Sequence, residues 1–262
     1  MNSLSVLRQS FLLLILLSLI AVAASAQSRR ASAISYCERG LQFHLNGELD
    51  LAIVDYSIAL KFDPNYATAY YNRGVAQYDK RNLDEAISDY TRAIELQPKY
   101  ADAYYNRGLA RKDKGEVDTA ITDYDSALQW KPDHVQAYNN RGNARRSKGD
   151  MDGALADYEQ ALKLDAKLAS AWNNRGNVWR AKGEWDKAIS DYTRAVHLDS
   201  RYAIAYLNRG VMYLRQQREP EATKDFTQAI KFDQNLEPVV EKYWRALREQ
   251  QRTEVSSRRT TR

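Results

Sequence analysis

Small and aromatic residues recur along the chain with a fixed spacing of 34 positions. A glycine column runs from Gly40 to Gly210, and two alanine columns begin at Ala52 and Ala59. A repeat of this length, with small and aromatic residues at helical spacing and charged residues between them, predicts an array of similar helical units. The two aromatic columns are Tyr36, Tyr70, Tyr104, Tyr138, Trp172 and Tyr206, and Tyr56, Tyr90, Tyr124, Tyr158, Tyr192 and Phe226.

Each unit is predicted to hold two helices joined by a short turn. In the second unit the sequence favours helices over residues 67–80 and 84–96, and Pro98 ends the pair because proline cannot continue a helix. Pro220 stands in the first turn of the second helix of the sixth unit, where proline is tolerated. Four turns carry a glycine, at Gly47, Gly115, Gly149 and Gly183. Acids at the start of the other second helices suit the helix dipole: Asp50, Asp84, Asp118, Asp152 and Asp186.

These columns resemble the tetratricopeptide repeat, a family with the same aromatic, glycine and alanine offsets. The proline that often closes a repeat of that family is present only at Pro64, Pro98 and Pro132. The resemblance implies an all-α fold, namely a right-handed α-solenoid of six helix-turn-helix repeats with a concave inner groove. The six repeats are expected at residues 33–66, 67–100, 101–134, 135–168, 169–202 and 203–236.

The residues after the sixth repeat predict a terminal capping helix. Residues 237–250 place Val240, Tyr243 and Leu247 among the apolar residues of one helical face, which can cover the open end of a stack. Residues 251–262 are basic and polar, and we expect them to be disordered. A basic tail can make weak contact with an anionic membrane surface, but a solvated tail is the simpler expectation.

The N-terminus has a composition of its own. Residues 1–26 combine a short start with one arginine, an almost purely apolar run, and a small-x-small site that ends at Ala26. This order is typical of a secretory signal peptide, so we expect cleavage after Ala26, a short polar start at residues 27–32, and a periplasmic or secreted protein. Retention of the segment as an N-terminal anchor is the alternative.

An arginine precedes the glycine in all six repeats, where the family usually has an apolar residue. An aspartate follows each arginine sixteen residues later, on the second helix of the same repeat. Because the turn lies midway between them, the two side chains should be level in an antiparallel hairpin, and neither charge is easily buried alone. We therefore predict structural pairs of Arg39 with Asp55, Arg73 with Asp89, Arg107 with Asp123, Arg141 with Asp157, Arg175 with Asp191, and Arg209 with Asp225.

The glycine column itself needs a reason. A glycine in a helix interior costs about 1 kcal/mol relative to alanine. We expect that close helix approach compensates this cost, with rings such as Tyr90 packed against the bare backbone of Gly74.

An asparagine column lies on the opposite face of the first helices. By resemblance this face lines the groove, where each amide can offer a donor and an acceptor to the main chain of an extended peptide. The alternative is that each amide bonds only to the neighbouring repeat. The column consists of Asn72, Asn106, Asn140, Asn174 and Asn208.

The residues around these asparagines change along the predicted groove. Its ends, at Leu41 and Val211, are more apolar, and Asp79 with Asp113 forms a small acidic spot. The flanking residues are Tyr71, Tyr78 and Tyr105 in the second and third repeats, Asn139, Asn143, Asn173 and Asn177 in the fourth and fifth, and a basic column of Lys112, Arg146 and Arg180.

This variation favours an extended ligand with an acidic group or a C-terminal carboxylate near Arg146 and Arg180. A solvated basic face is the simpler expectation. Some family members clamp a terminal carboxylate with lysine, asparagine and arginine. Asn143 and Asn174 match that pattern in part, but its characteristic lysines are absent, so a clamp of that form is not expected.

Composition limits the remaining functions. A formal net charge of +5 over 262 residues is weaker than nucleic-acid binding favours. The single cysteine, Cys37, cannot form an internal disulfide and is expected to be buried. His44, His134 and His197 fall at different places in their repeats, and no nucleophile, phosphate-binding or zinc motif occurs. We therefore expect no catalytic site, metal or cofactor.

Together these features predict a non-catalytic protein–protein interaction scaffold outside the cytoplasm. It would bind an extended peptide or partner helix of unknown identity in its concave groove. The alternative is a structural protein of the cell envelope that acts through self-association or its convex surface. The sequence leaves the oligomeric state open.

Overall fold

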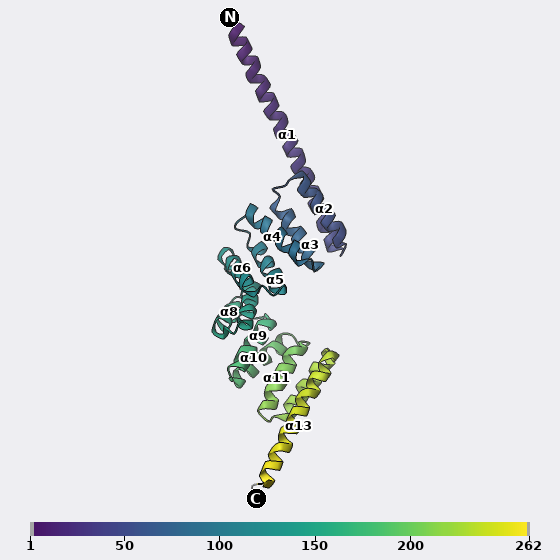
Figure 1. The fold of residues 1–262 in the computed structure, drawn as a ribbon, viewed down its shortest axis with the longest axis vertical. Helices are drawn as coiled ribbons and strands as arrows, with labels where there is room; N and C mark the ends of the chain where they lie inside the picture. The colour runs from purple at the N-terminus through teal and green to yellow at the C-terminus, as the bar shows by residue number, and fades with distance from the viewer. Residues whose placement is uncertain (1–2, 261–262) are drawn as a thin grey trace. The chain divides into compact units, whose positions relative to one another are not determined.

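The computed structural model describes residues 3–260, and the chain divides into two compact units between Pro132 and Asp133. Every regular element of the described residues is helical, and Figure 1 follows these helices by colour along the chain. Unit 1 holds α1 (Ser3–Leu45), α2 (Leu49–Phe62), α3 (Ala67–Asp79), α4 (Leu83–Leu96), α5 (Ala101–Asp113) and α6 (Val117–Trp130). Unit 2 holds α7 (Val135–Ser147), α8 (Met151–Leu164), α9 (Ala169–Ala181), α10 (Trp185–Leu198), α11 (Ala203–Arg215), α12 (Glu219–Phe232), a 3₁₀ turn (Gln234–Leu236) and α13 (Glu237–Thr260).

Consecutive helices pair as hairpins that stack side by side within each unit. In unit 1, α3 packs against its partner α4 and also against α2 of the preceding hairpin. In unit 2, α9 packs in the same way against α10 and α8. This arrangement confirms the expected all-α solenoid of helix-turn-helix repeats.

The core of each hairpin is built from the small and aromatic columns. Tyr90 is 1% exposed, and it packs with the fully buried Ala86. A Cβ added to Gly74 would lie 2.8 Å from Cε1 of the Tyr90 ring, inside van der Waals contact. The absence of a side chain at Gly74 therefore sets how closely α3 and α4 approach, as the sequence predicts.

The turn inside each hairpin requires a left-handed residue. Gly115 occupies this place with φ +86°, a conformation that glycine adopts without steric cost. In two hairpins the same place holds a residue with a side chain, Arg81 at φ 64° and Gln217 at φ 60°. Those two turns carry backbone strain that the glycine turns avoid.

The C-terminal helix α13 closes the end of unit 2. Val240 is buried, the Tyr243 ring stacks on Phe226 at 6.4 Å, and Trp244 meets the same ring edge-on at 5.7 Å. The helix runs on to Thr260, whereas the sequence predicted disorder over residues 251–262. Glutamine, arginine and glutamate favour helix, and no glycine or proline interrupts this segment. Residues 261 and 262 of the predicted tail lie outside the described residues.

The N-terminal helix α1 begins at Ser3 and continues without a break through the predicted cleavage site at Ala26. Leu19 and Val22 are 61% and 65% exposed, whereas Ala33 and Cys37 are buried against α2 and α3. Among the described residues, no helix combines the length and the apolar character that a membrane crossing needs. Cleavage after Ala26 stays a prediction.

Candidate functional site

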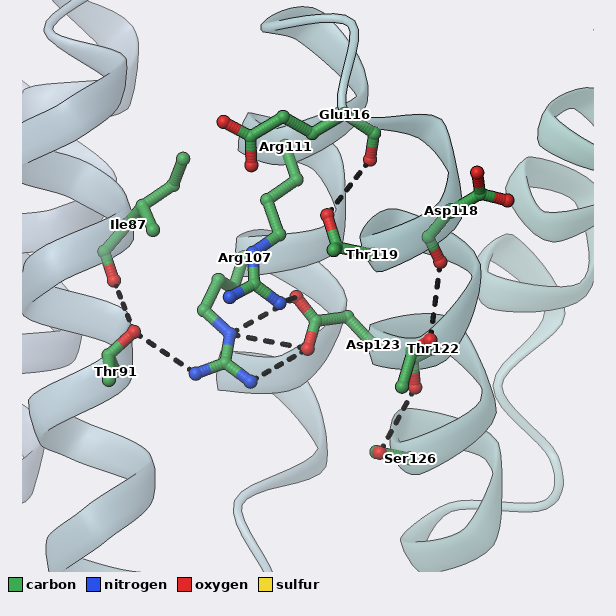
Figure 2. A network of polar contacts seen from close by, with 10 residues as sticks. All are labelled: Ile87, Thr91, Arg107, Arg111, Glu116, Asp118, Thr119, Thr122, Asp123 and Ser126. Carbon is green, nitrogen blue, oxygen red and sulfur yellow. Dashed lines mark hydrogen bonds and ion pairs between the residues drawn. The ribbon is translucent and has the colours of Figure 1, made fainter.

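The arginine column lies against the aspartate column inside each hairpin. Figure 2 shows the third repeat, in which Nη2 of Arg107 donates to Oδ1 of Asp123 at 2.7 Å and Nη1 donates to Oγ1 of Thr91 at 3.0 Å. Thr91 belongs to α4 of the preceding hairpin, and its hydroxyl donates to the Ile87 carbonyl at 2.7 Å. Arg107 therefore joins its own hairpin to the previous one.

All six predicted arginine–aspartate pairs lie in contact. The six aspartate residues are between 1% and 6% exposed, so each is almost fully withdrawn from water. In the second and sixth repeats as well, the arginine reaches a hydroxyl of the preceding hairpin, as Arg73 does with Ser57 and Arg209 with Thr193. The shortest distances are 2.5 Å for Arg39–Asp55, 2.7 Å for Arg73–Asp89, Arg107–Asp123 and Arg209–Asp225, 2.5 Å for Arg141–Asp157, and 2.8 Å for Arg175–Asp191.

Two of these aspartates accept from a second arginine that the sequence analysis missed. Arg111 donates to Asp123 at 2.8 Å, and Arg145 donates to Asp157 at 2.9 Å. Both lie one helical turn after the paired arginine, so their spacing was available in the sequence. These contacts hold the carboxylates of Asp123 and Asp157 between two arginines each, as expected for a structural role.

A second ladder, also missed, joins neighbouring hairpins at the surface. Lys114, at the end of α5, donates to Asp84 at 2.7 Å, and Lys182 donates to Asp152 at 2.6 Å. Lys80 contacts Asp50 in the same way. The aspartates of this ladder were assigned to helix starts from the sequence, whereas the structure also uses them to pair with the next repeat.

The asparagine column connects the first helices of neighbouring hairpins. Nδ2 of Asn106 donates to the Tyr71 hydroxyl at 2.8 Å, and Nδ2 of Asn72 donates to Sγ of Cys37 at 3.6 Å. In unit 2, Nδ2 of Asn174 donates to Oδ1 of Asn139 at 3.0 Å. Each of these bonds runs to a residue 35 positions earlier, on the first helix of the preceding repeat. These amide donors therefore bind the neighbouring repeat, which was the alternative to peptide binding.

Three residues expected to contact a ligand are instead buried. Asn139, Asn173 and Asn208 are 7%, 3% and 8% exposed, and Nδ2 of Asn208 donates to Oδ1 of Asn173 at 2.9 Å. Their assignment to the groove is therefore corrected. An amide that bridges two closely packed helices is covered by both, and the sequence contains no measure of that separation.

The predicted groove residues of unit 1 are mostly engaged with one another. Tyr78 donates to Asp113 at 2.7 Å, and Lys112 pairs with the same carboxylate at 3.2 Å. Burial alone would raise the pKa of Asp113, but the bonds from Tyr78 and Lys112 outweigh it and lower the pKa. Tyr105 lies half-buried near the Tyr124 ring, at 6.0 Å. This face presents tyrosine rings and few unpaired charges.

The corresponding face of unit 2 is different in chemistry. The Tyr158 hydroxyl donates to Oδ1 of Asn143 at 2.8 Å, and the Tyr192 hydroxyl donates to Oδ1 of Asn177 at 3.0 Å. Each asparagine lies three residues before an arginine of the basic column. We call Asn143, Arg146, Asn177 and Arg180, with the hydroxyls of Tyr158 and Tyr192, the Arg146–Arg180 site.

The positive charges of both arginines of this site act on the Tyr192 hydroxyl. Burial raises the pKa of Tyr192, and the positive charges of Arg180 and Arg146 both oppose that rise. Burial likewise raises the pKa of Tyr158 to about 12 against the charge of Arg146. Nε of Arg146 is buried and has no acceptor among the described residues. The site therefore holds concentrated positive charge and an unmet donor.

The two units carry no comparable metal or redox chemistry within the described residues. No cluster of histidine, cysteine and acidic side chains there could hold a metal ion. His44 contacts Asp79 at 2.8 Å, far along the chain from the other histidines. The Cys37 thiol is buried, and burial raises its pKa, which makes the reactive thiolate less available.

Comparison with known families agrees with the helix geometry. A model described as "TPR repeat" matches residues 40–81, 108–145, 142–179 and 176–217, and two models described as "Tetratricopeptide repeat" match residues 67–100 and 89–122. The chain belongs to the tetratricopeptide repeat family. Proteins of this family generally act as scaffolds for protein or peptide partners.

Solved tetratricopeptide structures share the fold at low identity. The chain is similar to PilF of Pseudomonas aeruginosa, with a TM-score of 0.73, 18% identity, and coverage of 84% of this chain and 99% of that one. It is similar to MamA, with a TM-score of 0.57, 24% identity, and coverage of 62% and 95%. It is also similar to YrrB, described as a TPR protein with an unusual peptide-binding site, with a TM-score of 0.57, 22% identity, and coverage of 68% and 92%. No curated protein sequence matches the chain.

Proposed function

We propose that the chain is a non-catalytic scaffold that holds an acidic, extended segment of a partner protein at the Arg146–Arg180 site. The observation that carries this proposal is the convergence of the Arg146 and Arg180 charges on the Tyr192 hydroxyl, beside Asn143 and Asn177. A ligand carboxylate would pair with the outer guanidinium nitrogens of Arg146 and Arg180, and charge-assisted bonds from arginine to carboxylate are strong.

The asparagines of the site favour a peptide over a simple anion. Asn143 and Asn177 accept from tyrosine hydroxyls through Oδ1, and these bonds do not use the Nδ2 donor of either amide. An amide donor beside a guanidinium suits the main-chain carbonyl and the side-chain carboxylate of an acidic residue. The description of YrrB as a peptide-binding protein of this fold supports the same kind of ligand.

The N-terminal pattern adds a location to this proposal. The apolar run before the small-x-small site at Ala26 favours export, so the partner would be met in the periplasm or outside the cell. No nucleic-acid ligand is proposed, because the net charge of +5 is mild.

A peptide titration tests the proposal. The probe is a fluorescein-labelled peptide with two adjacent glutamates in a glycine–serine background, and its control carries glutamines instead. The chain should bind the glutamate peptide at least tenfold more tightly, and Arg146→Ala with Arg180→Ala should abolish this preference. The matched control is Arg194→Ala with Arg201→Ala, which removes two exposed arginines outside the site and should retain the preference.

Two results would refute the proposal. One is equal binding of both peptides by the unaltered chain. The other is an absence of binding together with a particle mass that grows with concentration in sedimentation, which would favour the self-associating envelope protein.

A further inference from the structure

We infer that unit 2 has an apolar subsite beside the Arg146–Arg180 site, and that it receives one apolar side chain of the same acidic segment. This inference rests on the proposed function, because it concerns the same ligand. The subsite is a pocket of about 190 Å³ between α11 and α13. Its lining residues are Val211, Leu214, Arg215, Tyr243, Ala246 and Leu247.

The pocket continues the ligand face of the preceding repeats. Leu214 stands 34 residues after Arg180, and Val211 stands 34 residues after Asn177. The same repeat positions that carry arginine and asparagine in the fourth and fifth repeats therefore carry leucine and valine in the sixth. The face changes from cationic to apolar at its C-terminal end.

The floor and the rim of the pocket have different exposure. Val211 and Leu214 are 4% and 8% exposed and form the floor. Tyr243 and Leu247 are half-buried, and Ala246 is exposed at the rim. A ligand side chain can therefore reach apolar surface without displacing α13, and each buried methylene would contribute to binding.

A direct contact joins the charged site to the apolar pocket. Nη1 of Arg180 donates to Oδ1 of Asn208 at 3.3 Å, and Asn208 lies one helical turn before Val211 on α11. Neighbouring helices lie roughly 8–10 Å apart, and an extended chain advances about 3.3 Å per residue. The ligand would therefore carry its apolar side chain about three residues from its acidic group.

Charge complementarity favours an acidic segment as the ligand whose apolar side chain enters this pocket. Lysines and arginines outnumber aspartates and glutamates within residues 133–262, so unit 2 attracts an acidic segment. Arg215 adds one more positive charge at the rim of the pocket itself. A second copy of α13, which carries more basic than acidic residues, would gain nothing from these charges.

Two probe peptides test the inference. One has the order Glu-Glu-Gly-Gly-Leu and the other the reverse order. Each carries a fluorescein label, and each is compared with a form that has serine in place of leucine. For at least one order, the leucine form should bind at least tenfold more tightly than the serine form. Ala246→Gln should remove this difference and retain binding of the serine form.

The control variant is Ala156→Gln, which makes the same change at an exposed helical position of α8 and should retain the tenfold difference. If leucine and serine forms bind the unaltered chain equally, the apolar subsite is refuted and the acidic site stands. If neither form binds, the proposed function fails and the subsite fails with it. If Ala246→Gln lowers a self-associated mass without affecting the peptides, the pocket belongs to a second copy and the inference is overturned.

Discussion

Removal of the carboxylate at Asp123 should destabilise the chain more than removal of any exposed acid. Asp123 accepts from both Arg107 and Arg111, and their side chains are 2%, 12% and 23% exposed respectively. Asp123→Ala would leave two neighbouring guanidinium groups without a counter-charge. Breaking a buried pair in this way costs about 3–5 kcal/mol.

The variant Asp84→Ala provides the matched control. The Asp84 carboxylate pairs with Lys114, but its side chain is 80% exposed, and exposed pairs contribute about 0–1 kcal/mol. Urea unfolding followed by far-UV circular dichroism should therefore separate the two variants by at least 2 kcal/mol in unfolding free energy.

A double-mutant cycle tests the coupling within this network. Arg107→Ala with Asp123→Ala should cost less than the sum of the two single variants, because it removes a charge that would otherwise be stranded. Additive costs, or a cost of Asp123→Ala no larger than that of Asp84→Ala, would refute the reasoning.

Four further outcomes are expected. Gly74→Ala should lower the unfolding free energy by about 1–3 kcal/mol, since its Cβ would fall 2.8 Å from a buried ring, and a neutral result in urea unfolding would contradict the packing. Arg81→Gly should raise the melting temperature by relieving a positive φ, which calorimetry would measure, and a lowered value would exclude that strain. Asn174→Ala should lower the unfolding free energy by about 1–3 kcal/mol, because Oδ1 of the buried Asn139 loses its donor. Unchanged stability in urea unfolding would instead favour a role of the Asn174 amide in ligand binding. Mass spectrometry of the chain from an exporting bacterial host should give a product that begins after Ala26, and an intact N-terminus would favour the anchor.

Most of the fold could be predicted from the columns of small and aromatic residues that recur every 34 positions. Helices predicted over residues 67–80 and 84–96 are observed at Ala67–Asp79 and Leu83–Leu96, since proline, glycine and helix periodicity mark their ends. The arginine–aspartate pairs could be predicted because a hairpin places residues at equal distance from its turn side by side. That argument needs only the position of the turn.

The ligand face could be predicted only in part. The asparagine column was identified, but its amides bridge neighbouring repeats, and that depends on how closely two first helices approach. The pocket at Leu214 could not be predicted from the sequence, for a similar reason. It is formed with α13, which follows the last repeat and is placed by packing of Val240 and Tyr243 and not by the 34-residue period.

The most direct measurement of the central claim is the ¹⁵Nε–¹Hε spectrum of the arginines during titration with the diglutamate peptide. Nε of Arg146 has no acceptor among the described residues, whereas Nε of Arg175 already donates to Asp191 at 2.8 Å. The account predicts that the signals of Arg146 and Arg180 shift and saturate while the signal of Arg175 stays in place. An unchanged Arg146 signal at saturating peptide would contradict it.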